Sequence, residues 1–149
     1  MTYLDNAQKF VCVLNSTIAV PTLMNALGHV TAGLAAHLDP NAATYLNYIN
    51  EADNFVSKIA ESPFIVLKAK NSSQLALLRG AAAAAGIPHN VFISAMIGRS
   101  AEEQLAQTRT AGGAGLEYWA VALFGDSVKL HPITKKFSVF SSSSSPTGG

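Results

Sequence analysis

Residues 9–15 have the sequence KFVCVLN, and their centre, FVCVL at 10–14, is an unbroken apolar run. Alternating apolar and polar residues would indicate a strand with one face in water, whereas a continuous run is typical of a strand covered on both faces. We therefore predict a central strand at 10–14. The single cysteine, Cys12, lies inside this run, which indicates a buried structural thiol rather than a disulfide partner.

Helical and strand patterns alternate along the rest of the chain. Apolar residues recur every three or four positions from 20 to 38, where Pro21 marks the first turn of a helix. Ser72 or Ser73 is expected to cap a second helix that ends near Gly86, and Ser100 with Glu103 forms a capping box for a third. Further strands are predicted at 63–69, 90–97 and 118–125. The Asn- and Asp-containing segment 41–61 is interpreted as an irregular excursion with a short helix.

These elements predict one α/β domain at residues 1–140, followed by a Ser-rich C-terminal tail at 141–149. We expect a three-layer α/β/α sandwich whose sheet is mixed, mostly parallel, and made of about four strands. The segment KLHPITKKFSVF at 129–140 is expected to add a short edge hairpin or strand.

Composition restricts the partners. The chain has 149 residues, of which 49% are hydrophobic and only 13% charged, with a formal net charge of +1. A surface with so little charge favours self-association, and we expect a homodimer. The basic residues are spread along the sequence, which counts against tRNA or another polyanion as a partner. No apolar segment approaches the roughly 20 residues that cross a bilayer, and the lone cysteine suits a reducing compartment, so we expect a cytoplasmic protein without a membrane partner.

His29 is the first candidate for chemistry, because it stands near the middle of the apolar stretch PTLMNALGHVTAGLAAH at 21–37. Its helical neighbours Asn25, Ala26, Ala32 and Gly33 are small or polar. Such neighbours suit a pocket, with Asn25 as a hydrogen-bond partner, but they equally suit close helix packing. Both interpretations of His29, reagent and packed residue, stay open on this pattern.

Ligands of α/β proteins usually meet the carboxyl ends of strands, which points to the residues after each apolar run. Asn15 follows the first strand, and Ser94 and Arg99 belong to the segment after the third. Arg99 suits a carboxylate or phosphate group, although it equally suits a surface pair with Glu102 or Glu103. No acidic residue has an evident reason to orient His29 in a catalytic triad.

No cofactor signature is present. His29 and His37 are eight residues apart, about 80° around a helix and two turns along it, which is too far for one metal ion. The glycines of GGAG at 112–115 precede a strand, whereas a phosphate-cradling loop follows one, so a flexible connection is favoured. We expect neither a metal nor an organic cofactor.

Four segments follow one another in an order that resembles the type 2 peptidyl-tRNA hydrolase-like superfamily, and most of all a branch of small proteins of unknown function. These segments are KFVCVLN, NALGHVTAGL, FIVLKAKNSSQLALLRGAAAAAGIPHNVFISAMIGRS and LEYWAVALFG. The resemblance covers residues 9–137 and implies the peptidyl-tRNA hydrolase II-like fold. His29 matches the histidine of that superfamily's Gln-x-x-His segment. Ala26 stands at the glutamine, and Met96 stands at the aspartate of the Asp-Ala-Gly-Arg-Thr motif, of which Gly98 and Arg99 remain. The lysine that precedes the histidine segment is also replaced.

Two functional hypotheses follow. The first is an atypical superfamily member that binds an unknown small molecule in a pocket near His29. The alternative is a hydrolase acting on a peptidyl-tRNA or another ester conjugate, with His29 as general base and Asn15, Asn25, Ser94 or Arg99 orienting the substrate. Structural self-assembly without a ligand is a third, weaker hypothesis.

Overall fold

The structure of the protein is a computed structural model that describes residues 7–113 and 116–141. The predicted tail, apart from Ser141, lies outside these residues. The described strands are β1 (Gln8–Asn15), β2 (Tyr45–Asn50), β3 (Phe55–Ala60), β4 (Phe64–Ala69), β5 (His89–Ile93), β6 (Tyr118–Asp126) and β7 (Ser138–Val139). The described helices are α1 (Val20–His37), α2 (Ser72–Ala84), the 3-10 turn η1 (Ser94–Met96), α3 (Ala101–Thr110) and α4 (Ser127–Thr134).

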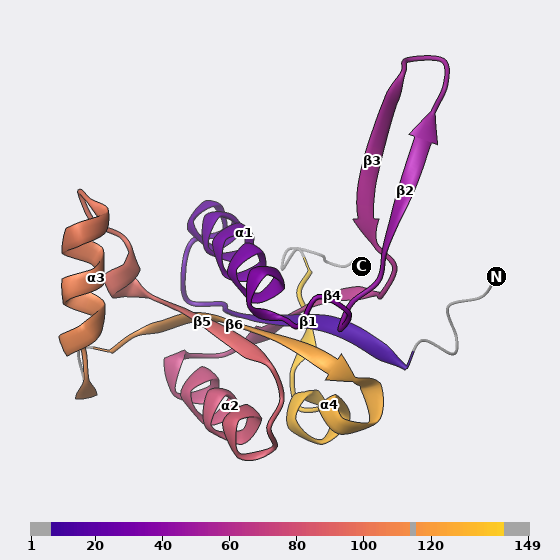
Figure 1. Ribbon diagram of the computed structural model, residues 1–149. Coiled ribbons are helices and arrows are strands. Elements are labelled where there is room, and N and C mark those ends of the chain that lie inside the picture. The colour runs from indigo at the N-terminus through magenta and orange to yellow at the C-terminus, as the bar shows by residue number, and fades with distance from the viewer. Residues whose placement is uncertain (1–6, 114–115, 142–149) are drawn as a thin grey trace, which may run out of the picture.

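A five-stranded mixed sheet in the order β5-β6-β1-β4-β7 forms the centre of this single α/β domain. The helix α1 lies on one face of the sheet, and α2 and α4 lie on the opposite face (Figure 1). As predicted, β1 is a central strand, with β6 on one side and β4 on the other.

The apolar side chains of β1 belong to the cores on both faces of the sheet. Val11 and Val13 belong to the core cluster under α2 and α4, whereas Phe10, Cys12 and Leu14 belong to the cluster under α1. Because successive side chains of a strand point to opposite faces, a strand with helices on both sides needs apolar residues at every position. The stripe Leu23, Ala26, Val30 and Leu34 buries α1 against the second cluster.

The prediction of a mostly parallel sheet is wrong. Among the strand pairs of the described chain, β1 with β4 is parallel, whereas β1 with β6, β5 with β6 and β4 with β7 are antiparallel. Helices cover both faces here whatever the strand direction, so a continuous apolar run does not distinguish the two kinds of pairing. The sheet has five strands rather than about four, and the fifth is the edge strand β7, which forms within the segment 129–140 where an edge hairpin or strand was expected.

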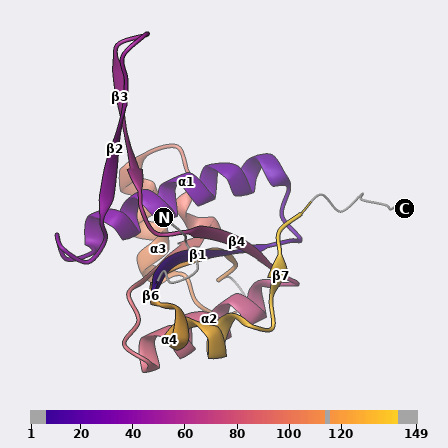
Figure 2. The same cartoon turned by 90° about the vertical axis from the view of Figure 1, so that its right-hand side faces the viewer.

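The interpretation of residues 41–61 is also wrong, because β2 and β3 form an antiparallel hairpin that projects from the body of the molecule (Figures 1 and 2). Opposite residues such as Ile49 and Val56 share one face, while Leu46 and Ile59 share the other. Neither strand alternates cleanly between polar and apolar residues along its length, which is why the period of a strand was not recognised. Asn54 adopts a left-handed conformation with φ of 61° at the turn.

The helix ends follow local side chains. Asn71 caps α2 by accepting a hydrogen bond from Gln74 N at 3.0 Å, in place of the predicted Ser72 or Ser73. Ser100 caps α3 as predicted, and its Oγ accepts from Glu103 N at 3.2 Å. The first part of the segment 129–140, where an edge hairpin or strand was expected, belongs instead to the helix α4, which is capped by Asp126. The edge strand itself follows as β7.

Candidate functional site

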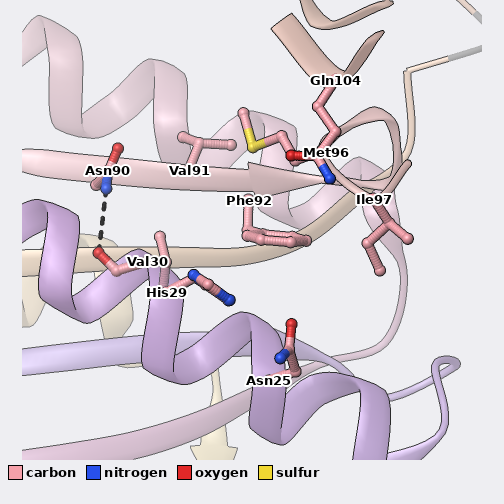
Figure 3. Close-up of a pocket in the computed structure, with 9 residues that line it drawn as sticks. All are labelled: Asn25, His29, Val30, Asn90, Val91, Phe92, Met96, Ile97 and Gln104. Atoms are coloured by element: carbon pink, nitrogen blue, oxygen red, sulfur yellow. Dashed lines mark hydrogen bonds between the residues drawn. The ribbon is translucent and has the colours of Figure 1, made fainter. Parts of the chain in front are cut away.

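A cavity of about 490 Å³ lies between α1, β5 and the segment from η1 to α3 (Figure 3). Its size falls within the roughly 300–1,000 Å³ of small-molecule sites. The lining residues combine neutral polar and apolar side chains: Asn25, His29, Val30, Asn90, Val91, Phe92, Met96, Ile97 and Gln104. Of these described residues, none is a lysine, arginine, aspartate or glutamate. The wall therefore offers hydrogen-bonding groups and lacks a permanently charged side chain.

The helix α1 presents Asn25 and His29 to this cavity from positions one turn apart. At the other end of the cavity, a hydrogen bond joins α1 to β5. Asn90 Nδ2 donates this bond to the carbonyl oxygen of Val30 at 3.1 Å. Gly33 makes room for this contact, since a Cβ at that position would lie 2.6 Å from Asn90 Nδ2. The sequence left a pocket and close packing open for this small residue, and at Gly33 the structure shows close packing of α1 against β5.

Aromatic rings support the imidazole side of the cavity. The ring of His29 lies 6.3 Å from that of Phe92, which in turn stacks on Trp119 at 5.8 Å. In Figure 3 the imidazole lies between α1 and Phe92. Phe92 is buried, and His29 is exposed. The buried ring thus fixes one flank of an accessible imidazole.

His29 makes no hydrogen bond with any described residue of the chain. A second hollow of about 400 Å³ shares Asn25 and His29 with the first and continues over Met24, Gly28 and Ala32. The imidazole therefore borders two hollows. It lacks, within the described chain, the carboxylate or carbonyl that orients a catalytic histidine.

Asn15 lies elsewhere and serves the fold. It is 1% exposed, its Nδ2 donates to the carbonyl oxygen of Tyr118 at 2.9 Å, and its Oδ1 accepts from Thr17 N at 2.9 Å and Thr17 Oγ1 at 2.7 Å. These bonds connect the end of β1 to the start of β6. The side chain has no lining position in the cavity beside His29.

Ser94 and Arg99 also lie outside the lining of that cavity. Ser94 begins η1, and its backbone N–H donates to the carbonyl oxygen of Glu117 at 3.0 Å. Arg99 is exposed, and its backbone N–H donates to Glu103 Oε1 at 3.0 Å. Of the five residues selected from the sequence, the structure brings Asn25 and His29 together in one cavity.

Sequence reasoning missed the far wall. Asn90, Phe92 and Met96 occupy the predicted third strand and its continuation, and Gln104 lies on the capped helix α3. The polar Asn90 at the start of an otherwise apolar strand was the available signal. Its significance depends on Gly33, which is distant in sequence.

Metal-ligating side chains do not gather at this site. Within residues 7–113 and 116–141, no three His, Cys, Asp or Glu side chains lie close enough to hold an ion together. His37, the other histidine of α1, lines a different hollow with His89. The predicted flexible connection at 112–115 includes two residues outside the described chain.

A family model described as "Protein of unknown function (DUF2000)" matches residues 8–141. The chain belongs to the DUF2000 family. The match spans all the described elements, from β1 to β7. No curated protein sequence matches the chain.

Among solved structures, a protein of unknown function, Atu0240 from Agrobacterium tumefaciens strain C58, has a similar fold. The TM-score is 0.74 at 17% identity, over 91% of this chain and 98% of that one. At this identity the likeness concerns the fold alone. In the described part of this DUF2000 protein, no helix has both the length and the apolar content to span a membrane.

Proposed function

We propose that this DUF2000 protein is an atypical relative of the type 2 peptidyl-tRNA hydrolases that binds a small molecule in the cavity beside His29. The observation that carries the proposal is the cavity itself, which combines His29, Asn25, Asn90 and Gln104 with an apolar floor. The resemblance of the sequence motifs supports the superfamily, with a three-layer peptidyl-tRNA hydrolase II-like arrangement. The replacement of the superfamily's lysine and aspartate favours binding over its usual chemistry.

The lining indicates the chemistry of the ligand. Amide groups and an imidazole supply hydrogen-bond donors and acceptors without a permanent charge, and Phe92 with Met96 and Ile97 supplies apolar contact. A charged ligand would lose hydration without meeting an opposite charge on the lining residues. The occupant is therefore an uncharged molecule that carries both an apolar body and an amide-like or heteroaromatic edge.

Ligand-observed NMR with uncharged fragments such as nicotinamide and benzamide tests this proposal. Binding to the wild type is expected to fall at least roughly fivefold in His29→Ala, which removes both the ring contact and a hydrogen-bonding group. His37→Ala is the matched control, because it removes an exposed histidine from the same helix outside the cavity. Absence of binding to the wild type, or equal binding to His29→Ala, contradicts the proposal.

Hydrolysis of a peptidyl-tRNA or another ester conjugate is the second candidate. The exposure of His29 on a cavity wall favours it, since a general base must reach water and substrate. Its test is turnover of a model peptidyl-tRNA by wild type and His29→Ala. Turnover by the wild type that disappears in His29→Ala would establish hydrolysis, and an inactive wild type would remove it.

We also propose a cytoplasmic homodimer. The β2–β3 hairpin exposes six large apolar side chains: Tyr45, Tyr48, Ile49, Phe55, Val56 and Ile59. Isolated two-stranded hairpins are marginally stable in water, so this one needs a cover. We take a second copy of the chain as this cover, because it carries the same apolar patch and can pack against the first copy about a two-fold axis. The single buried cysteine supports the reducing compartment.

A further inference from the structure

A further cavity lies where the parallel strands β1 and β4 end, toward the β7 edge of the sheet, whereas the cavity beside His29 lies at the β5 edge. Its volume is about 250 Å³, below the range of drug-sized sites. The polar residues of its lining are Ser16, Lys68, Lys70, Gln74, Lys136 and Ser138. It shares no lining residue with the cavity beside His29. A small polar group matches these dimensions.

Positive charge is concentrated here. Three of the ten basic residues of the chain line this one cavity, and its described lining residues include no aspartate or glutamate. None of the three lysines forms an ion pair within the described chain. An anion in this cavity would be attracted by all three ammonium groups at once.

The backbone around the lysines is fixed before any ligand arrives. Ser16 N donates to the carbonyl oxygen of Ala69 at 2.9 Å, which ties the end of β1 to the end of β4. Lys70 N donates to Gln74 Oε1 at 2.8 Å, and Lys68 pairs with Ser138 in the β4–β7 register. These bonds hold the backbone segments that carry Lys68 and Lys70 at the cavity, so on binding the lysine side chains have to be ordered but their backbone does not.

Nearby groups add further donors. The hydroxyl of Ser16 can donate to an oxyanion, and the thirteen-residue helix α2 begins at Ser72, directly after Lys70 and its cap Asn71. The amino end of a helix carries partial positive charge. Several ammonium groups and hydroxyl donors suit the multiple oxygens and double charge of a phosphate monoester better than the single charge of a carboxylate.

From this geometry we infer that the cavity formed by Ser16, Lys68, Lys70, Gln74 and Lys136 binds the phosphoryl group of a small phosphate monoester. The assignment goes beyond the function proposed for the His29 cavity and does not depend on it. The sequence places Ser16, Lys68 and Lys70 at the ends of two predicted strands, where ligands of α/β sheets usually bind, but Lys136 is far from them along the chain. The return of the chain through α4 and β7 brings it alongside.

Isothermal titration calorimetry at low ionic strength tests the assignment, with inorganic phosphate and glycerol 3-phosphate as probes and glycerol as the uncharged comparison. The wild type is expected to bind both phosphates saturably and glycerol not at all. Lys70→Gln/Lys136→Gln is expected to weaken the affinity roughly tenfold or more, because each substitution removes a charge-assisted contact. Both side chains are exposed, so the variant is expected to fold, which circular dichroism verifies.

Lys58→Gln/Lys129→Gln is the matched control, since it removes two exposed lysines outside the cavity. Its phosphate affinity is expected to stay within about twofold of the wild type, and Lys70→Arg/Lys136→Arg is expected to retain binding. No saturable binding by the wild type, or an equal loss in both Gln pairs, overturns the assignment. Capture by phosphatidic acid vesicles without binding of glycerol 3-phosphate would also overturn it, in favour of a lipid surface.

Discussion

At the scale of single residues, Asn15 shows how a polar side chain after a strand can belong to the fold rather than to a ligand. At 1% exposure, its amide donates one hydrogen bond and its carbonyl oxygen accepts two. Asn15→Ala leaves Tyr118 O and Thr17 N without these partners, and we expect it to lower the free energy of unfolding by about 1–3 kcal/mol. Urea denaturation measures this loss.

Asn47→Ala provides the comparison, because Asn47 is exposed on the hairpin. Its effect is expected to stay within about 0.5 kcal/mol of the wild type. If the two variants unfold at the same urea concentration, the structural role assigned to Asn15 is wrong.

Gly33 and Gly28 on α1 give a second, paired prediction. Gly28→Ala meets no atom within 4 Å and is expected to stabilise the protein by about 0.5–1 kcal/mol through helix propensity. Gly33→Ala places Cβ against Asn90 Nδ2 and breaks the hydrogen bond to Val30 O, which offsets that gain by about 1 kcal/mol. Unfolding in urea should therefore rank Gly28→Ala above Gly33→Ala. Equal stabilisation by both would show that Asn90 moves aside without loss.

Among the elements, those with a single clear period were predictable from the sequence. The stripe of α1 and the continuous apolar runs of β1, β4 and β6 gave the correct element types. The hairpin was not predicted, because both of its faces are exposed and mix polar with apolar residues. The β-branched and aromatic residues on either side of an Asn-rich turn were the signal that remained.

The hairpin also carries the prediction for the dimer. Ile49→Glu/Val56→Glu changes two opposed residues that are 71% and 62% exposed, so the fold is expected to survive while the dimer dissociates. Burying two carboxylates in an apolar contact is unfavourable enough to weaken the dimer by roughly a hundredfold or more. Light scattering after size exclusion, over a range of concentrations, measures the mass.

Leu105→Glu/Val128→Glu is the control, because it places the same charges on exposed apolar positions outside the hairpin. This variant is expected to remain dimeric. A wild type that is monomeric at every concentration would refute the dimer, and dissociation of the control variant alone would place the contact elsewhere.

For the molecule as a whole, the sequence indicated an α/β domain but not the direction of its strands. Pairing direction depends on which strands become neighbours, and the apolar residues of β6 fit either direction when helices cover both faces of the sheet. The candidate site was likewise only partly predictable from the sequence. Residues on one helix, Asn25 and His29, share a cavity, whereas Asn90 and Gln104 join them only through the packing of distant elements.

The buried Cys12 links the stability of the whole fold to pH. Burial raises the pKa of its thiol from 9.0 to about 12. Between these values the unfolded chain releases the proton while the folded chain keeps it, so stability contributed by the protonated thiol is present below about pH 9 and is lost as the pH rises toward 12. The urea midpoint should therefore drop more between pH 7 and pH 10 in the wild type than in Cys12→Ala, which lacks the titrating group. Parallel slopes would contradict this.

The hairpin also affects how the chain finds its fold. It is inserted in the connection between β1 and β4, and Glu61 N donates to Thr44 O at 2.8 Å across its base. The entropy lost on closing a loop grows only with the logarithm of its length, about 0.6 kcal/mol per doubling. The hairpin less than doubles the length of this connection, so it adds little to the entropy cost of pairing β1 with β4. This connection is therefore a place where a chain can gain or lose a whole module without changing how its sheet assembles.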